Sequence, residues 1–339
     1  MTTLRRLPLA GLLVLAALLA ACGSAEDTPT SGSATTTKTA APIRLGFDSW
    51  VGYGVLQLAA QRGYFEREGV EVDITLTQDT PQRLAALRAN RLDATATTVD
   101  TLAAANARGS QLVQVLGLDA SVGGDGIVAT NDIASVPDLK GKSVAVHRGT
   151  TGEFLLSTVL QRNGLSLDDV KLVDLKPDDA GAAFAAGQVP AAVTYEPWLS
   201  KSKARGRVLA STRDFPDLVA DTLAFRADFI REHPDSVHAF VRAYAAALQE
   251  LAQNPEASQQ AIAKAMELSP AELRETLKTI RFYSIADSRR LLGTPQAPGP
   301  LYALFTSAGE FWQESGETTS VAPADEAIDA SFLEHLAQQ

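Results

Sequence analysis

Ile43-Arg-Leu-Gly-Phe47 is the first strand-like run after the N-terminal segment, and Ser143-Val-Ala-Val-His147 repeats its pattern 100 residues later. Both are short runs of mostly apolar residues, which is typical of strands buried in a sheet. After each run a helical pattern follows, and the chain then returns to another strand-like run. Alternating strands and helices indicate α/β architecture. These two stretches therefore predict two similar α/β lobes.

The repeat continues through two further strand-like runs in each half of the chain. The matching runs share a preceding break and come in the same order: 71–76 and 92–97 in the first half, 171–175 and 189–194 in the second. Such self-similarity supports two related structural units. Two more strand-like runs, Asp125–Thr130 and Asp221–Arg226, bracket the second repeat and are predicted to be the crossings between the lobes.

After Arg226 the pattern becomes helical. Apolar residues recur three and four positions apart from Val237 to Leu251, which is typical of an amphipathic helix. Ser269-Pro-Ala-Glu272 is a capping box that opens another helix. We expect this helical C-terminal region to pack on the first lobe.

The first 22 residues read as a targeting segment. Two arginines precede an apolar run from Leu7 to Ala21, and Leu19-Ala-Ala-Cys22 is a lipobox. The run has 15 residues, whereas a membrane-spanning helix needs about 20. We therefore predict a signal peptide over 1–22 and a lipid on Cys22 after cleavage, with an ordinary buried cysteine as the alternative. Residues 23–42 lack large aliphatic side chains and are predicted to be a flexible tether.

Composition excludes several classes of protein. The chain has 339 residues, of which 45% are hydrophobic and 21% charged, so it is neither disordered nor a multi-span membrane protein. A net charge of -10 argues against a nucleic-acid partner. Cys22 is the only cysteine, so the body holds no disulfide and no cysteine metal site.

Two stretches resemble enzyme motifs, but each lacks a residue that the motif requires. Gly141-Lys-Ser143 resembles the end of a phosphate-binding loop, but Val136 stands where the motif requires glycine. Gly52-Tyr-Gly54 follows a strand as in a dinucleotide fingerprint, but Gln57 replaces its third glycine. None of the four histidines stands in a metal-ligand motif. We expect no catalytic residue, no metal and no cofactor.

Polar and aromatic residues follow the predicted strand ends in both halves. Open α/β sheets bind ligands at this position. The candidate ligand-binding residues are Trp50, Tyr53, Thr97, Thr98, Asp125, Thr150, Thr151, Tyr195, Glu196 and Trp198. The Thr97-Thr98 and Thr150-Thr151 pairs stand at helix starts, which suit an anion, although they also serve as helix caps. A capping box with Thr150 explains Glu153 locally, and Trp198 fits a core or a site equally well.

Trp50-Val-Gly-Tyr53 and the motifs that follow it resemble the nitrate, sulfonate and taurine family of ABC-transporter substrate-binding proteins. The further motifs are Leu58-Ala-Ala-Gln-Arg-Gly-Tyr-Phe65, Asp138-Leu-Lys-Gly-Lys-Ser-Val-Ala-Val146, Gly149-Thr-Thr-Gly152 and Ala192-Val-Thr-Tyr-Glu-Pro-Trp198. The resemblance implies a two-lobed type II periplasmic-binding fold that closes over a small solute and presents it to a membrane permease. It also implies ligand contacts from Trp50, Thr97, Thr98, Thr150, Thr151, Tyr195 and Glu196. A related branch that makes the thiamin pyrimidine carries a cysteine-rich motif, which this chain lacks.

These observations predict a monomeric, extracytoplasmic, lipid-anchored binding protein for an ABC importer. The predicted lobes are 43–128 with 222–339, and 129–221. One alternative is an enzyme of this fold that uses Glu196 or His147 as an acid or base. Another is a lipoprotein that senses a solute and signals through a partner.

The acidic residues near the predicted site bear on the ligand. They are Asp48, Asp119, Asp125, Glu196 and Asp221, with only Arg148 and His147 as nearby cations. Either these acids bond to backbone and hinge groups, as we expect of Asp125 and Asp221, or some hold a positive group on the ligand. Glu196 stands beside two aromatics and is predicted to hold an ammonium group. The expected ligand is a taurine-like zwitterion or another aminated organic anion, ahead of nitrate, with a neutral heteroaromatic compound as the alternative.

Overall fold

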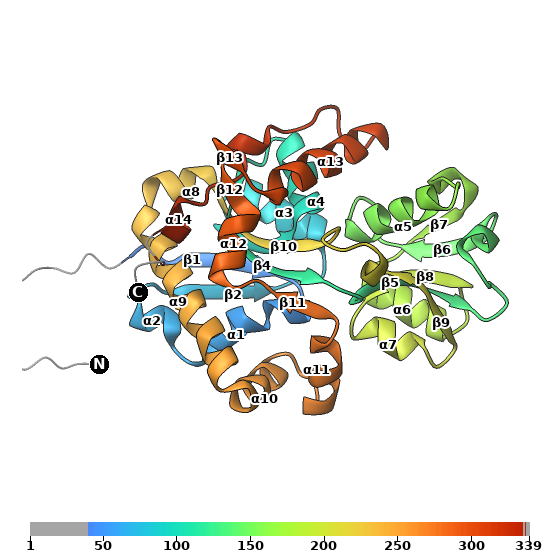
Figure 1. The fold of residues 1–339 in the computed structure, drawn as a ribbon, viewed down its shortest axis with the longest axis horizontal. Coiled ribbons are helices and arrows are strands. Elements are labelled where there is room, and N and C mark those ends of the chain that lie inside the picture. Colours follow the sequence, from blue (N-terminus) through green and yellow to red (C-terminus); the bar gives the residue numbers. More distant parts are fainter. Residues whose placement is uncertain (1–39, 335, 337–339) are drawn as a thin grey trace, which may run out of the picture. The chain divides into compact units, whose positions relative to one another are not determined.

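A computed structural model describes residues 40–334 and 336. Two sheets organise this part of the chain (Figure 1). The six-stranded sheet has the order β11-β4-β10-β3-β1-β2 and the five-stranded sheet the order β7-β6-β8-β5-β9. The first is built from β1 (Ile43–Phe47), β2 (Val72–Leu76), β3 (Ala94–Thr98), β4 (Leu112–Ser121), β10 (Ala220–Arg226) and β11 (Ile280–Phe282). The second is built from β5 (Asp125–Thr130), β6 (Ser143–Val146), β7 (Lys171–Asp174), β8 (Ala191–Tyr195) and β9 (Gly206–Ser211).

The two sheets share one topology, which confirms the α/β two-lobed fold expected from the repeat. In the first sheet β2, β1 and β3 are parallel and β10 runs antiparallel to β3. In the second, β7, β6 and β8 are parallel and β5 runs antiparallel to β8. The antiparallel strand beside each parallel set, β10 or β5, comes directly after a strand of the other sheet. The chain therefore passes between the lobes twice.

The crossings lie a few residues earlier than the sequence pattern suggests. Asp125–Thr130 and Asp221–Arg226 are regular strands, β5 and most of β10, and each pairs within a single sheet. The segments that pass between the sheets precede them, at 122–124 and 212–219. Strand-like composition identified these runs but could not assign them to a sheet, because partner choice depends on contacts between distant segments.

Helices cover both sheets (Figure 1). Around the strands up to β10 they are α1 (Gly54–Gln61), α2 (Tyr64–Arg67), α3 (Thr80–Arg88), α4 (Val99–Ala107), α5 (Thr151–Arg162), α6 (Pro177–Ala185) and α7 (Trp198–Ser202). After β10 they are α8 (Ala227–Glu232), α9 (Pro234–Gln253), α10 (Pro255–Ala265), α11 (Pro270–Leu277), α12 (Ile285–Leu292), α13 (Pro300–Glu314) and α14 (Ser331–Glu334), with the small hairpin β12 (Gly293–Thr294) and β13 (Ala297–Pro298).

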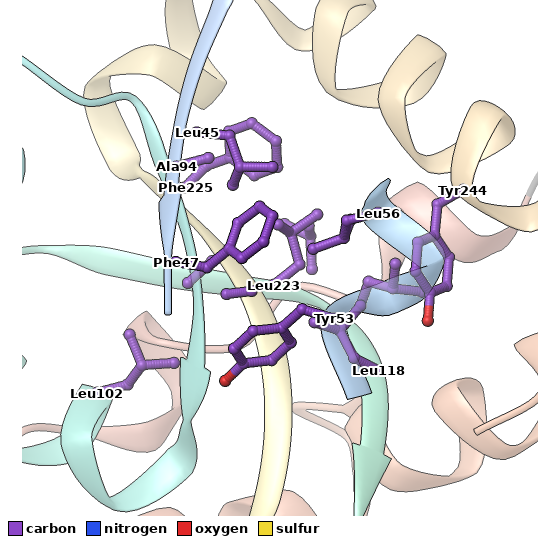
Figure 2. Packing of buried hydrophobic residues seen from close by; sticks show 14 of the residues in the cluster. Leu45, Phe47, Tyr53, Leu56, Ala94, Leu102, Leu118, Leu223, Phe225 and Tyr244 are labelled. Carbon is purple, nitrogen blue, oxygen red and sulfur yellow. The ribbon is translucent and has the colours of Figure 1, made fainter. Parts of the chain in front are cut away.

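The helices after β10 pack on the first sheet, as expected. Phe240 of α9 contacts Phe65 and Phe225 through its ring, and Trp312 of α13 donates its indole N–H to the carbonyl of Asp100. Figure 2 shows the core between β1, β10 and α1, where the rings of Phe47 and Tyr53 meet edge to face with centroids 5.6 Å apart. Burying such side chains supplies most of the favourable free energy of folding.

The second lobe has separate clusters of buried side chains. One includes Leu155 of α5 and Val146 of β6, and the other includes Phe184 of α6 and Ala192 of β8. The five-stranded sheet is therefore covered by a helix layer on each side. Within the described residues, no helix combines the length and apolar character needed to cross a bilayer.

Candidate functional site

A cavity of about 70 Å³ lies where the strand ends of both sheets meet. Its lining includes residues that follow or end all six parallel strands: Asp48 after β1, Gln78 and Thr80 after β2, Thr97 and Thr98 at the end of β3, His147 after β6, Pro177 after β7, and Thr194 and Tyr195 at the end of β8. Asp125 and Asp221 join them because the antiparallel strands β5 and β10 begin at this edge. This is the location that α/β sheets favour for ligands.

Two helices begin at the cavity and face one another. The hydroxyl oxygens of Thr98, just before α4, and Thr151, the first residue of α5, are 2.7 Å apart. The first N–H groups of a helix have no acceptor inside the helix and carry partial positive charge. One threonine of each predicted pair is thus brought to the same point, where two helix N-termini suit an anionic group. The Asp100 carboxylate lies there too and accepts the Thr151 hydroxyl at 3.2 Å.

The start of α5 differs in detail from the predicted capping box. The Thr150 hydroxyl donates to the carbonyl of His147 at 2.8 Å, so it does not cap the helix. Glu153 instead accepts the backbone N–H of Gly149 at 2.7 Å. These two hydrogen bonds fix the loop that precedes α5.

An aromatic wall lies beside this point. The rings of Trp50 and Tyr195 meet edge to face with centroids 5.8 Å apart, and they come from different lobes. The Tyr195 hydroxyl donates to the side-chain oxygen of Gln78 at 3.0 Å. Tyr53 is buried and donates its hydroxyl to Asp221. All three aromatic residues line the cavity, and the hydroxyl groups of Tyr53 and Tyr195 are both hydrogen-bonded.

Buried carboxyl groups form the rest of the wall. Asp119 accepts the Trp50 indole N–H at 2.8 Å and pairs directly with Asp221 across β4 and β10. Burial, and then the neighbouring carboxylates, raise the pKa of Asp125 to about 7. Burial likewise raises the pKa of Asp119 to about 7 and that of Asp100, next to the Thr98–Thr151 contact, to about 6. Burial and the charge of Asp119 raise the pKa of Asp221 well above its usual value.

Positive charge around the cavity is sparse. Among the described residues that line it, His147 is the only titratable base, and burial lowers its pKa. Arg83 of α3 lies behind the wall, fully buried, with its guanidinium 3.4 Å from the Asp48 carboxylate and 2.9 Å from the Thr77 carbonyl. Nowhere in the described part of the chain do three His, Cys, Asp or Glu side chains lie close enough together to hold a metal ion.

Sequence reasoning missed Gln78 and Arg83. Gln78 follows β2, so the strand-end pattern applied to the second parallel strand would have found it. Arg83 occupies an ordinary helical position, and nothing in its local sequence signals that its side chain turns inward.

Two predicted residues lie away from the cavity. Both Glu196 oxygens accept hydrogen bonds from Ser200, one from the backbone N–H at 3.0 Å and one from the hydroxyl at 2.7 Å. Trp198 is the first residue of α7, and the Lys201 ammonium lies 4.6 Å from its ring. Neither lines the cavity. The structure therefore gives no support to an ammonium contact from Glu196, because its carboxylate is used to hold the start of α7. Cys22 lies outside the described residues.

Comparison with known proteins agrees with this architecture. Residues 53–258 match the family described as NMT1/THI5 like. A putative binding protein of Brucella abortus (strain 2308) is 29% identical over 244 residues, which are 70% of this chain and 75% of that protein. The taurine-binding periplasmic protein of Escherichia coli (strain K12) is 25% identical over 204 residues, 58% of this chain and 63% of that protein.

The fold has counterparts among solved structures. The alkanesulfonate-binding protein SsuA from Xanthomonas axonopodis pv. citri, bound to MOPS, superposes with a TM-score of 0.72 at 23% identity, covering 85% of this chain and 98% of that chain. The family match confirms the resemblance found in the sequence. The chain belongs to the NMT1/THI5-like family and has the two-lobed fold of the periplasmic binding proteins.

Proposed function

We propose that this protein binds a small solute with a strongly acidic group, of the sulfonate and taurine class, and delivers it to an ABC importer. The observation that carries the proposal is the meeting of the α4 and α5 N-termini across the lobes, with the Thr98 and Thr151 hydroxyls in contact. Two helix N-termini supply backbone donors and partial positive charge to one anionic group. The names of the taurine and alkanesulfonate relatives agree with such a ligand.

The contact between the two helix starts bears on how the solute enters. The Thr98 and Thr151 hydroxyls lie 2.7 Å apart, so this contact has to separate before an anionic group can bind between them. Lys176 and Asp79, from the two lobes, form an ion pair of 3.0 Å that also has to part when the lobes open. Ligand contacts then replace the threonine contact as the lobes close.

The binding role is proposed without a catalytic step. Glu196, one of the two residues that an enzyme of this fold would use here, is held by Ser200 and does not line the cavity. The relatives named above are binding proteins. Turnover of a bound solute by the purified protein would contradict this reading.

Thr151→Val tests the anion site. Removing this hydroxyl should weaken a sulfonate ligand by about 1.5–3 kcal/mol, the scale of a hydrogen bond to a charged group. Isothermal titration of alkanesulfonates and taurine into the wild type and the variant measures the difference. Thr158→Val is the matched control, because Thr158 lies on the same helix and donates to the Phe154 carbonyl instead of lining the cavity. Equal loss in both variants, or no sulfonate binding by the wild type, would contradict the proposal.

The anchor is proposed from the sequence alone. The apolar run and the lipobox ending in Cys22 predict a lipid-carrying N-terminus on the outer side of the cytoplasmic membrane or in the periplasm. Cys22→Ser should release the protein from membranes, because one lipidated cysteine supplies the anchor. Fractionation followed by a carbonate wash measures this. A variant that still pellets with the membrane shows that the anchor assignment is wrong.

A further inference from the structure

Three threonine hydroxyls and one carboxyl group form a continuous chain of contacts where α4 and α5 meet. The Thr98 hydroxyl oxygen lies 3.0 Å from that of Thr101 and 2.7 Å from that of Thr151, which in turn lies 3.2 Å from Oδ1 of Asp100. The three threonines line the cavity. Asp100 stands in the first turn of α4, does not line the cavity and is only 2% exposed.

The charge of Asp100 decides which way these hydroxyls point. Each threonine hydroxyl has one proton, and an ionised carboxylate only accepts hydrogen bonds. With Asp100 ionised, the Thr151 proton is directed to Asp100, and the contact between Thr98 and Thr151 then uses the Thr98 proton. Neither proton is left for a ligand. With Asp100 protonated, its carboxyl group donates to Thr151, and the Thr151 proton is free for an oxygen atom of an anionic group.

The other charged groups on the surrounding elements do not offset a negative charge on Asp100. The three arginines there are each paired with an acid: Arg83 with Asp48, Arg108 with Glu317, and Arg148 with Glu153. The remaining charged or titratable groups are Asp119 of β4, Asp125 of β5, Asp221 of β10, the exposed Glu310 and Glu314 of α13, and His147 after β6. An ionised Asp100 would therefore repel an anion held at the two helix starts.

Both charge states of Asp100 are populated near neutral pH. Burial is the main cause that raises its pKa to about 6, and hydrogen bonds from Thr98 and Thr151 oppose part of that rise. Asp125 is close enough for the charge of Asp100 to raise the pKa of Asp125 in turn. An anion bound beside Asp100 favours the protonated form in the same way, because like charges disfavour ionisation.

We propose that closure of the lobes over an anionic solute is coupled to protonation of Asp100, so that this buried acid regulates the affinity of the site. This inference rests on the proposed function and adds its regulation. The anionic group enters between the two helix starts, Asp100 takes up a proton from solvent and donates to Thr151, and Thr151 donates to the solute. Because the bound state holds the proton more tightly, the affinity rises as the pH falls. Loss of the proton favours release.

Ethanesulfonate is a suitable probe because its sulfonate stays ionised from pH 5.5 to pH 8. Isothermal titration of the wild type should show the affinity falling about tenfold or more over this range, since one coupled proton changes affinity by up to about tenfold per pH unit. Titration at pH 7 in two buffers of different ionisation enthalpy should show net proton uptake on binding. Binding without proton uptake would overturn the inference and leave the proposed function intact.

Asp100→Asn locates the proton. The amide is neutral at every pH and resembles the protonated acid in shape and in carrying a donor. The variant should match the wild type at pH 5.5, which also shows that it is folded, and should bind ethanesulfonate about tenfold or more tightly than the wild type at pH 8. Asp100→Ser is a second neutral replacement and should likewise lose the coupled proton uptake. Uptake that persists undiminished in either variant would overturn the assignment to Asp100.

Glu196→Gln is the matched control. It removes another buried carboxylate that does not line the cavity, and Ser200 holds that carboxylate away from the helix starts. Its affinity should therefore keep the pH dependence of the wild type. Equal tightening at pH 8 in Glu196→Gln and Asp100→Asn would show a general effect of net charge and overturn the inference. Absence of ethanesulfonate binding at every pH would overturn the proposed function and this inference with it.

Discussion

Lowering the pH from 8 to 5 is expected to stabilise the ligand-free protein against unfolding. Burial raises the pKa of Asp119 and Asp125 to about 7 and that of Asp100 to about 6. In the unfolded chain these groups titrate near pH 4. Between those values the folded state binds protons that the unfolded state does not, so the free energy of unfolding falls as the pH rises. The destabilisation is absent below about pH 4 and complete above about pH 7.

The size of the effect follows from the shift of a single group. The pKa of Asp125 moves from 3.8 to about 7, which corresponds to about 4 kcal/mol for that acid at alkaline pH. The groups whose charge raises this pKa are Asp100, Asp48 and Glu196. His147 opposes the trend, because its lowered pKa makes the unfolded state the better proton acceptor as the pH falls. The raised pKa values of Asp100, Asp119 and Asp125 outweigh this single opposing group, so the net stability still rises as the pH falls.

Thermal unfolding at constant ionic strength and pH 5, 6, 7 and 8 measures this dependence. Asp125→Asn should gain less stability on acidification than the wild type, since it no longer titrates. Asp138→Asn is the control: Asp138 is exposed, hydrogen bonds from Ser135 lower its pKa, and it therefore titrates below this window. An unfolding temperature that stays constant or falls between pH 8 and pH 5 would show that the buried acids are charged without cost.

The fold was predictable because its signals are local and repeated. The runs at 43–47 and 143–147 became β1 and β6, and each is the middle strand of a parallel triplet. Periodicity and strand-end position are properties of a few consecutive residues, so a single sequence shows them. The crossings were misplaced by a few residues because β5 and β10 look like any other strands until their partners are known.

The site was predictable as a region but not as a set of contacts. The threonine pairs and Trp50 lie where the strand-end rule puts them. Both Glu196 and Asp125 were predicted to bind the ligand, but only Asp125 lines the cavity. The backbone N–H and the hydroxyl of Ser200 bind the Glu196 carboxylate, which turns it toward α7. That distinction depends on helix α7 and on the pairing of β5 with β8, which local sequence does not encode.

Gly52 shows how a familiar motif can arise from packing. In the sequence, Gly52-Tyr-Gly54 resembles part of a dinucleotide fingerprint. In the structure, a Cβ on Gly52 would lie 2.2 to 2.4 Å from all three carboxyl atoms of Asp119, and a Cβ on Gly54 would lie 2.6 Å from Ile262. Both glycines are explained by close approach of side chains. A phosphate is not needed to account for either of them.

Gly52→Ala is therefore expected to destabilise the protein by about 3–5 kcal/mol. Overpacking a tight site costs about 1–3 kcal/mol, and displacing the carboxylate that accepts the Trp50 indole N–H adds the loss of a charged hydrogen bond. Because Trp50 lines the cavity, ligand affinity should fall as well. Chemical denaturation and titration with the same ligand measure both losses.

The double variant Gly52→Ala with Asp119→Ala isolates the cause. Removing the Asp119 carboxyl group makes room for the new methyl group, so the combined loss of stability should be smaller than the sum of the two single losses. Residues in direct contact typically show such non-additivity, by about 0.5–3 kcal/mol. Additive losses would mean that the alanine acts through the backbone of the Val51–Tyr53 turn instead. In that case the contact with Asp119 would not explain the glycine.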